Sequence, residues 1–123
     1  MAKILIVDDE DSVRLMVKEM LRMSNHEVSE AKNGREAMEK FCAQPADLII
    51  TDLVMPDKSG IDLIMELKEK FPTARILAIS GGGGITGRFD YLPIAQLLGA
   101  DFILKKPFQM KELCLKVDTL LAA

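Results

Sequence analysis

Four apolar stretches of this chain each end at polar residues that could take part in chemistry. One runs from Leu48 to Ile50 and leads through Thr51 to the carboxylate of Asp52. The residues after the other three stretches are Asp8 and Asp9, Ser80, and Lys105 and Lys106. Each residue alone also fits a simple helix cap or turn. Their coincidence at four such ends favours one shared site, since ligands of open α/β sheets bind beyond the carboxyl ends of the strands.

The chemistry of such a site would be that of carboxylates held close together. Neighbouring carboxylates raise one another's pKa unless a cation lies among them. Mg²⁺ suits this position because it prefers oxygen ligands and is commonly held by one or two carboxylates together with a phosphate. A carboxylate beside Mg²⁺ and a lysine could attack phosphorus and form an aspartyl phosphate. Ser80 could then donate a hydrogen bond to the product.

The elements that must position these residues alternate along the chain. Short apolar or alternating runs predict five strands, at 4–7, 25–31, 47–51, 75–79 and 102–104. Apolar residues at helical spacing predict five helices between and after them, at 13–21, 35–41, 61–71, 91–98 and 110–121. In the first helix the expected buried stripe includes Met16, and we expect most of the eight methionines to pack in the core. The alternation predicts a parallel sheet in a three-layer α/β sandwich.

Composition predicts one domain over residues 1–123, with 49% hydrophobic and 28% charged residues. A net charge of -3 disfavours direct nucleic-acid binding. The apolar start at 4–7 is too short for a signal peptide or a membrane span, so no membrane partner is expected. Cys42 and Cys114 are interpreted as reduced thiols of a cytoplasmic protein. His26 lies on a short edge strand and is interpreted as a surface residue.

Several motifs occur together in one order. They are Val7-Asp8-Asp9-Glu10, the segment from Asp52 to Gly60, Ala78-Ile79-Ser80-Gly81, Gly99-Ala100-Asp101 and Lys106-Pro107-Phe108. They resemble the receiver domain of two-component response regulators, and the resemblance covers essentially the whole chain. It implies a flavodoxin-like (βα)5 fold with strand order 2-1-3-4-5. No output domain follows the last predicted helix, so a stand-alone receiver is expected.

The resemblance also implies roles for individual residues. Asp52 would accept a phosphoryl group from a sensor histidine kinase or phosphotransfer protein. Mg²⁺ would be bound by Asp8, Asp9, Asp52 and the backbone carbonyl of Val54. Lys106 would pair with the phosphoryl group, and Ser80 would be the hydroxyl that moves toward it. The protein would catalyse only its own phosphorylation and dephosphorylation, and would act on a downstream target protein as a monomer or weak dimer.

Two features depart from the family pattern, and two further residues bear on dephosphorylation. Ile103 stands where the family usually has an inward-turning Tyr or Phe, with Phe102 beside it. The glycine-rich loop after Ser80, Gly81–Arg88, is predicted to order on phosphorylation. Val54 and Gly82 occupy positions where a polar side chain often positions water for hydrolysis, so slow dephosphorylation is predicted.

Other functions remain open at this stage. The protein could be a relay intermediate that only shuttles phosphoryl groups, or a Mg²⁺-dependent phosphohydrolase with an aspartyl intermediate. The hydrolase is disfavoured because no general acid lies two residues from Asp52. The spacing Gly82-x-Gly84-x-x-Gly87 formally matches a dinucleotide fingerprint, but it follows the fourth predicted strand and no acidic ribose site is evident.

Overall fold

The computed structural model describes residues 2–55, 58–80 and 92–122. In the described chain, strands and helices alternate throughout. The strands are β1 (Lys3–Val7), β2 (Glu27–Ala31), β3 (Leu48–Asp52), β4 (Ile76–Ser80) and β5 (Phe102–Lys105). The helices are α1 (Asp11–Arg22), α2 (Gly34–Ala43), α3 (Gly60–Lys70), α4 (Leu92–Leu98) and α5 (Met110–Ala122). The predicted loop at 81–88 lies outside the described residues, and none of the described helices has the length and apolar character needed to cross a membrane.

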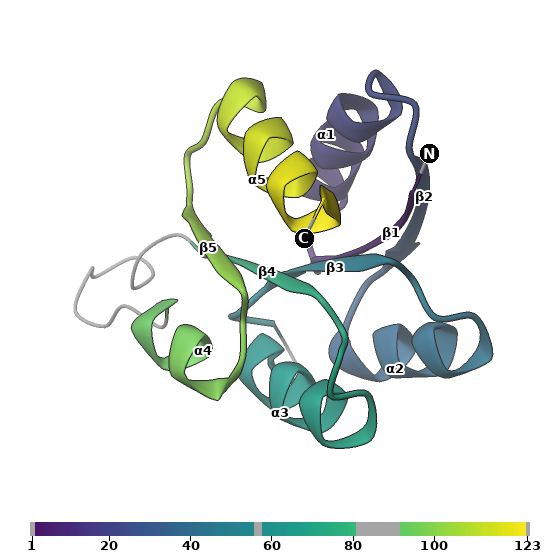
Figure 1. Ribbon diagram of the computed structural model, residues 1–123, viewed down its shortest axis with the longest axis vertical. Helices are drawn as coiled ribbons and strands as arrows, with labels where there is room; N and C mark the ends of the chain where they lie inside the picture. The colour runs from purple at the N-terminus through teal and green to yellow at the C-terminus, as the bar shows by residue number, and fades with distance from the viewer. Residues whose placement is uncertain (1, 56–57, 81–91, 123) are drawn as a thin grey trace.

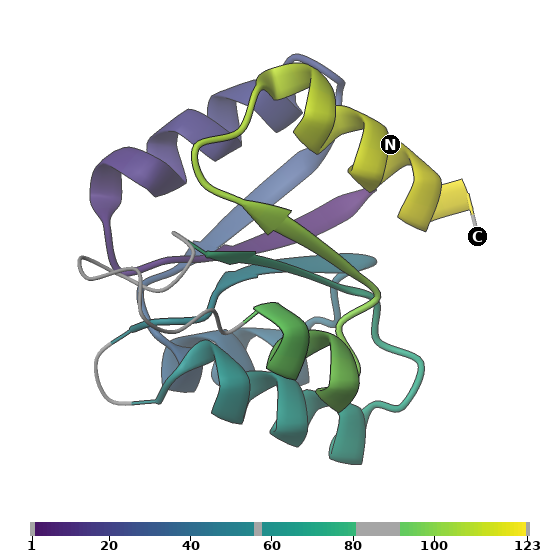
Figure 2. The ribbon, with the colours of Figure 1, turned by 90° about the vertical axis from the view of Figure 1, so that its left-hand side faces the viewer.

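The strands form one parallel sheet in the order β2-β1-β3-β4-β5, as predicted (Figure 1). Helices α1 and α5 cover one face, and α2, α3 and α4 cover the other (Figure 2). Both faces of the sheet are therefore buried, which explains why the central strands are apolar at consecutive positions. Alternate residues of each strand supply the two cores. Leu5 and Ile49 pack toward α2 and α3, whereas Ile6 and Ile50 pack toward α1 and α5.

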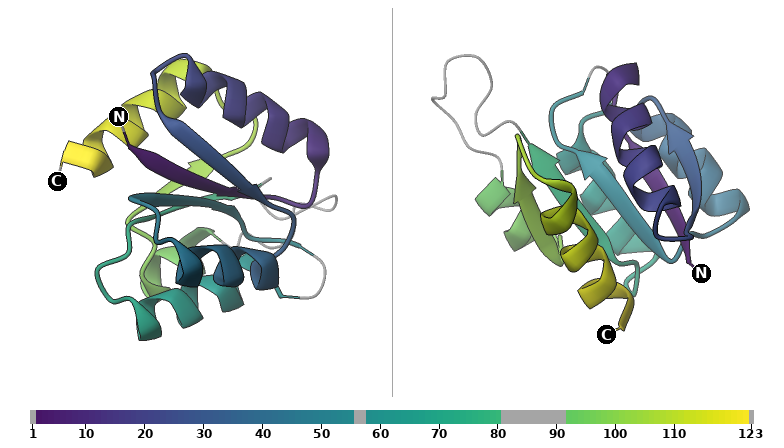
Figure 3. Two further views of the ribbon diagram at one scale, coloured as in Figure 1. Left: turned by 90° about the vertical axis from the view of Figure 1, so that its right-hand side faces the viewer. Right: turned by 90° about the horizontal axis from the view of Figure 1, so that it is seen from above.

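The register of the sheet aligns the strand ends that carry the polar residues. Val7 lies beside Thr51, and Asp52 lies beside Ile79. At the far side Ser80 lies beside Lys105. The carboxyl ends of β1, β3, β4 and β5 therefore meet at one edge, and the two chain termini lie at the opposite edge (Figure 3).

Local sequence determines where two helices begin. The Asn33 side chain accepts a hydrogen bond from the Glu36 amide at 2.9 Å and caps α2. Ser59 does the same for α3, accepting from the Asp62 amide at 3.2 Å. Both are residue types that favour this position, because a short polar side chain can satisfy an otherwise unpaired amide.

The buried face of α1 differs from the prediction at one position. Met16, expected in the buried stripe, is 42% exposed, whereas Arg14 is only 7% exposed and faces inward with Val17 and Leu21. The prediction for the methionines was also wrong in most described cases. Only Met38 and Met55 are buried, and the exposed ones are Met16, Met23, Met65 and Met110. The flexible, unbranched methionine side chain is found both in cores and on surfaces, so helical spacing alone did not predict its burial correctly.

The prediction that His26 lies on the surface was wrong. Its side chain is only 11% exposed. Nδ1 accepts a hydrogen bond from the Ala2 amide at 3.3 Å, and Nε2 lies 4.0 Å from a carboxylate oxygen of Asp118 on α5. His26 lies just before β2, and its contacts with Ala2 and with Asp118 of α5 shield a side chain that the prediction left exposed.

Candidate functional site

Asp52 ends β3 with its carboxylate held inside the protein. The residue is 6% exposed, and its Oδ1 accepts a hydrogen bond from the Leu53 amide at 2.9 Å. Its backbone carbonyl accepts from the buried hydroxyl of Thr51 at 2.8 Å. Both contacts come from its immediate neighbours in sequence. The carboxylate is therefore fixed by the strand end itself.

The start of α3 packs directly against this strand end. The Gly60 amide donates to the Leu53 carbonyl at 2.9 Å. A Cβ atom at Gly60 would lie 2.0 Å from the Asp52 carbonyl oxygen, far inside any permitted contact. Only glycine allows the helix to begin so close to Asp52, which explains the glycine at the end of the segment that the sequence singles out.

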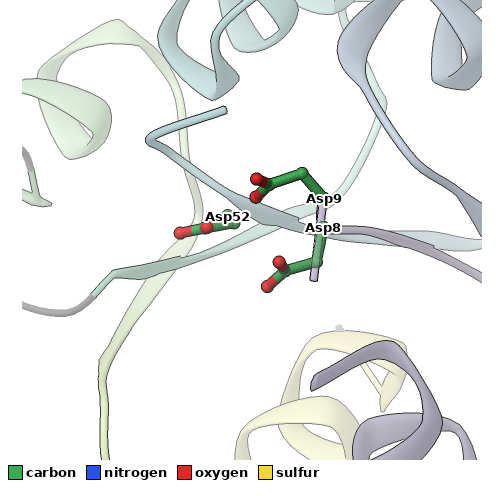
Figure 4. A group of neighbouring side chains, drawn as sticks. All are labelled: Asp8, Asp9 and Asp52. Atoms are coloured by element: carbon green, nitrogen blue, oxygen red, sulfur yellow. The ribbon is translucent and has the colours of Figure 1, made fainter. Parts of the chain in front are cut away.

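Asp8 and Asp9 lie beside Asp52 from the neighbouring strand. One carboxylate oxygen from each of the three residues lies within 4.8 Å of the others. Figure 4 shows the Asp8 and Asp9 side chains leaving the chain on opposite sides of the ribbon. Asp8 is fully buried and its Oδ1 accepts from the Glu10 amide at 2.9 Å, whereas Asp9 is exposed. Glu10 is the N-cap residue of α1 and makes no side-chain capping bond.

Lys106 brings a cation to the same carboxylates. Its Nζ lies 3.2 Å from Asp8 Oδ2 and 3.6 Å from Asp52 Oδ2. The Lys106 amide donates to the Ser80 carbonyl at 2.7 Å, which ties the end of β5 to that of β4. Lys105 is exposed, so of the two consecutive lysines the second is the one that faces the carboxylates.

Burial and neighbouring charges shift the pKa values of Asp52 and Lys106. The pKa of Asp52 is raised from 3.8 to about 6, first by burial and then by the charge of Asp8, against the opposing effect of Lys106. Burial alone would lower the pKa of Lys106, but the charges of Asp52 and Asp8 outweigh it and the pKa is raised. At neutral pH the site therefore holds an ionised Asp52 in a poorly solvated position beside a protonated lysine.

Ser80 and Val54 complete the set of residues that the sequence singled out. Ser80 ends β4, next to the strand of Asp52, and is 1% exposed. The Val54 side chain is 55% exposed just beyond Asp52. The structure thus brings Asp8, Asp9, Asp52 and Lys106 into direct proximity. The metal-binding role of the Val54 carbonyl and the hydroxyl role of Ser80 stay predictions.

The three carboxylates fit a hard divalent cation. Their oxygens converge within the 4.8 Å that a single ion would span, and all are oxygen donors, which Mg²⁺ prefers. Asp8 and Asp52 are both buried, so water screens their negative charges poorly. A bound cation would offset these charges. The residues present therefore suit Mg²⁺, with Asp9 as the ligand most open to solvent.

Strand β5 places Phe102 and Ile103 on opposite faces of the sheet. Phe102 packs on the α5 side, where the Lys116 ammonium lies 5.2 Å from the ring centroid. Ile103 packs on the other side, with the core under α3 and α4. Phe102 consequently does not substitute for the inward-turning aromatic residue that the resemblance implies at the position of Ile103, because neighbouring strand residues point to opposite faces.

One charged residue next to the site was missed by sequence reasoning. Arg14 is buried on α1 and its Nη1 donates to the Asp8 carbonyl at 2.6 Å. A signal was present, because Arg14, Val17 and Leu21 share the spacing of one helix face. The spacing was read only through its apolar members.

Comparison with known proteins places this geometry in a family. Residues 4–118 match the family model described as the response regulator receiver domain. The chemotaxis protein CheY of Thermotoga maritima is 37% identical over 108 residues, 87% of either chain. The transcriptional regulatory protein ResD of Bacillus subtilis is 35% identical over 97% of this chain, which spans only 48% of ResD.

Solved structures agree with this match. A receiver domain protein from Clostridium thermocellum superposes with a TM-score of 0.89 at 28% identity, covering 99% of this chain and 95% of that one. The response regulator TrrA of Thermotoga maritima, described in complex with Mg(2+)-BeF, superposes with a TM-score of 0.84 at 35% identity, covering 98% and 99%. The likeness therefore extends over nearly all of this chain and nearly all of both solved chains.

Proposed function

This chain belongs to the response regulator receiver domain family, and we propose that it is a phosphorylation-dependent switch that accepts a phosphoryl group on Asp52. The observation that carries the proposal is the buried Asp52 carboxylate with Lys106 at 3.6 Å and two further carboxylates within 4.8 Å. The donor would be the phosphohistidine of a sensor kinase or phosphotransfer protein. A downstream target would then recognise the phosphorylated protein.

The transfer follows from the charges of the residues present. An Asp52 oxygen attacks phosphorus while the bond from phosphorus to the donor nitrogen breaks, and the electron pair stays on that nitrogen. With a pKa of about 6, Asp52 is mostly ionised at neutral pH and needs no separate base. Lys106 is close enough to pair with a phosphoryl oxygen, and Ser80, at the end of the neighbouring strand, would donate a hydrogen bond.

Mg²⁺ held by Asp8, Asp9 and Asp52 would neutralise charge on the phosphoryl oxygens during transfer. The convergence of the three carboxylates supports this ligand set. The description of TrrA in complex with Mg(2+)-BeF supports Mg²⁺ as the ion. Before transfer the same carboxylates repel one another, and Lys106 offsets only part of that repulsion. The side chains of the site thus supply too little positive charge to balance its carboxylates, and a bound cation would supply the rest.

Phosphorylation of Asp52 would leave a doubly charged group where a single carboxylate lies now. Lys106 is at present bonded to Asp8, and the phosphoryl group would compete for it. The Lys106 amide donates a hydrogen bond to the Ser80 carbonyl. A displacement of Lys106 would therefore also displace the ends of β4 and β5. We therefore propose that the change in conformation begins at these two strand ends.

The proposal is tested with a small phosphodonor such as phosphoramidate and Mg²⁺. Intact mass should increase by one phosphoryl group in the wild type, and chelation with EDTA should prevent it. Asp52→Asn should gain nothing, whereas Asp62→Asn, which makes the same change at an exposed residue of α3, should react like the wild type. A phosphorylated Asp52→Asn protein would overturn the assignment.

Two further measurements define the role. Phosphotransfer profiling against candidate histidine kinases, with Asp52→Ala as control, would identify the donor. We propose that the chain is no general enzyme and catalyses only its own phosphorylation and dephosphorylation. Repeated turnover of a small phosphomonoester would instead show a phosphohydrolase.

A further inference from the structure

Arg14 is the buried cation of α1, and its contacts lead to the acidic pair. Its side chain is only 9% exposed. Nη1 donates to the Asp8 carbonyl at 2.6 Å, Nη2 bonds to Asp11, and Nε lies 3.4 Å from Glu30 on β2. One planar guanidinium thus joins the start of α1, the end of β1 and the neighbouring strand.

The contact with Asp8 bears on the turn that carries two of the three carboxylates. The Asp8 amide donates to the Ala31 carbonyl at 3.2 Å, and its side chain accepts from Glu10. Arg14 satisfies the remaining backbone group of Asp8, its carbonyl. That carbonyl belongs to the peptide unit that joins Asp8 to Asp9, so Arg14 fixes the orientation of the exposed Asp9 as well as the buried Asp8.

We propose that Arg14 is a positioning residue that holds Asp8 and Asp9 in the arrangement that binds a divalent cation. The inference rests on the proposed function, in which these carboxylates bind Mg²⁺. Groups that orient metal ligands typically change metal affinity by about 10–100-fold when they are removed. A turn with a free carbonyl would have to be ordered at the moment of binding, which weakens affinity.

The sign of the effect separates positioning from charge. Arg14 is itself a cation, and a cation near a metal site repels the metal. If charge alone mattered, removal of Arg14 would tighten the binding of a divalent ion. If Arg14 positions the carboxylates, its removal weakens binding despite the lost repulsion.

The chain offers a matched control on the next turn of α1. Lys18 Nζ lies 3.2 Å from the other oxygen of Glu30, so Lys18→Met and Arg14→Met each remove one cation that Glu30 binds. Arg14→Lys keeps the charge and places three N–H donors on one nitrogen, but it loses the planar fork that reaches three acceptors. Binding of Mn²⁺, used as a spectroscopic substitute for Mg²⁺, is measured from the loss of the free-ion EPR signal, with unfolding by urea followed in parallel.

We expect the Kd for Mn²⁺ to rise about 10-fold or more in Arg14→Met and to recover in part in Arg14→Lys. Lys18→Met should bind as tightly as the wild type or more tightly. The phosphorylation rate of Arg14→Met should need more Mg²⁺ for half-saturation while its maximal rate is unchanged. A general loss of stability would not produce this split.

An Arg14→Met protein that binds Mn²⁺ as tightly as the wild type, or more tightly, would overturn the inference. If Arg14→Met does not fold, Arg14→Lys decides the matter, since a wild-type Kd in that variant would also overturn it. A wild type that binds Mn²⁺, weakened by Arg14→Met, but never takes a phosphoryl group would overturn the proposed function and leave the positioning role standing.

Discussion

The Nζ of Lys106 lies closer to Asp8 than to Asp52, at 3.2 Å against 3.6 Å from the nearest carboxylate oxygens. Lys106 is thus shared between the ends of β1 and β3, and its hydrogen bond goes to the fully buried partner. Asp8 thereby holds the lysine within reach of Asp52, and the shared lysine neutralises the Asp52 carboxylate only in part. The raised pKa of Asp52 is consistent with this incomplete neutralisation.

Removal of Lys106 should raise the pKa of Asp52 further above about 6, because the lysine charge favours the ionised form. Lys106→Met should show this in an NMR titration of the Asp52 carboxyl carbon. Lys105→Met removes the same charge from the exposed neighbouring position and should change that pKa much less. Equal shifts of the Asp52 pKa in the two variants would contradict the prediction that the lysine acts through its short distance to Asp52.

Asp52 should make stability depend on pH. Its pKa is higher in the folded chain, about 6, than the 3.8 of an unperturbed carboxyl, so between these values the folded state binds more protons and stability falls as pH rises. Above pH 6 the ionised carboxylate destabilises the fold by about 3 kcal/mol. Asp52→Asn cannot ionise.

Urea unfolding in EDTA should therefore find Asp52→Asn more stable than the wild type by about 2–3 kcal/mol at pH 7, with a difference that shrinks toward pH 4. Asp62→Asn is the control at an exposed carboxyl. A gain in Asp52→Asn that is equal at both pH values would show that the ionised state of Asp52 is not its cause.

Gly60→Ala should destabilise the protein more than Gly34→Ala, although both glycines begin a helix. The added methyl at Gly60 would meet the Asp52 carbonyl oxygen at 2.0 Å, whereas at Gly34 it would meet the Lys58 side chain at 2.8 Å and the Lys58 carbonyl oxygen at 2.9 Å, which is a much milder overlap. Overpacking of this kind costs about 1–3 kcal/mol or more, and a backbone atom cannot move aside as a lysine side chain can. Urea denaturation of both variants checks the order, and a larger loss in Gly34→Ala would contradict it.

The aspartyl phosphate should be long-lived, closer to hours than to seconds, because Val54 cannot position a water molecule. Its side chain is 55% exposed, so Val54→Asn should be tolerated and should shorten the lifetime at least about tenfold, given that positioned polar groups contribute about 10²–10⁴-fold. Leu97→Asn, a like change at an 87% exposed position of α4, should leave the lifetime unchanged. Decay of the phosphorylated species is followed by intact mass after the phosphodonor is removed, and a wild-type lifetime of seconds would contradict the prediction.

The sheet and its polar edge were predictable because strand patterns are local. Apolar residues at consecutive positions, as in 4–7 and 48–50, indicate strands buried on both faces, and the polar residue after each strand marks its carboxyl end. The positions of Asp52, Asp8 and Asp9 near one another then follow from the order of the strands. That order itself came from resemblance to a family, since the pattern of apolar residues does not specify which strands are neighbours.

Local residue patterns were thus enough to predict the fold class, the sheet edge that carries the site and the residue types gathered there. The remaining features depend on tertiary packing. Arg14 became a buried partner of Asp8, His26 was covered by α5, and Lys106 was shared between two carboxylates. The contacts of these residues depend on which helix face packs against which strand end. The raised pKa of Asp52 depends on burial. Neither can be predicted from a short stretch of sequence, because both arise from segments that are far apart in the chain.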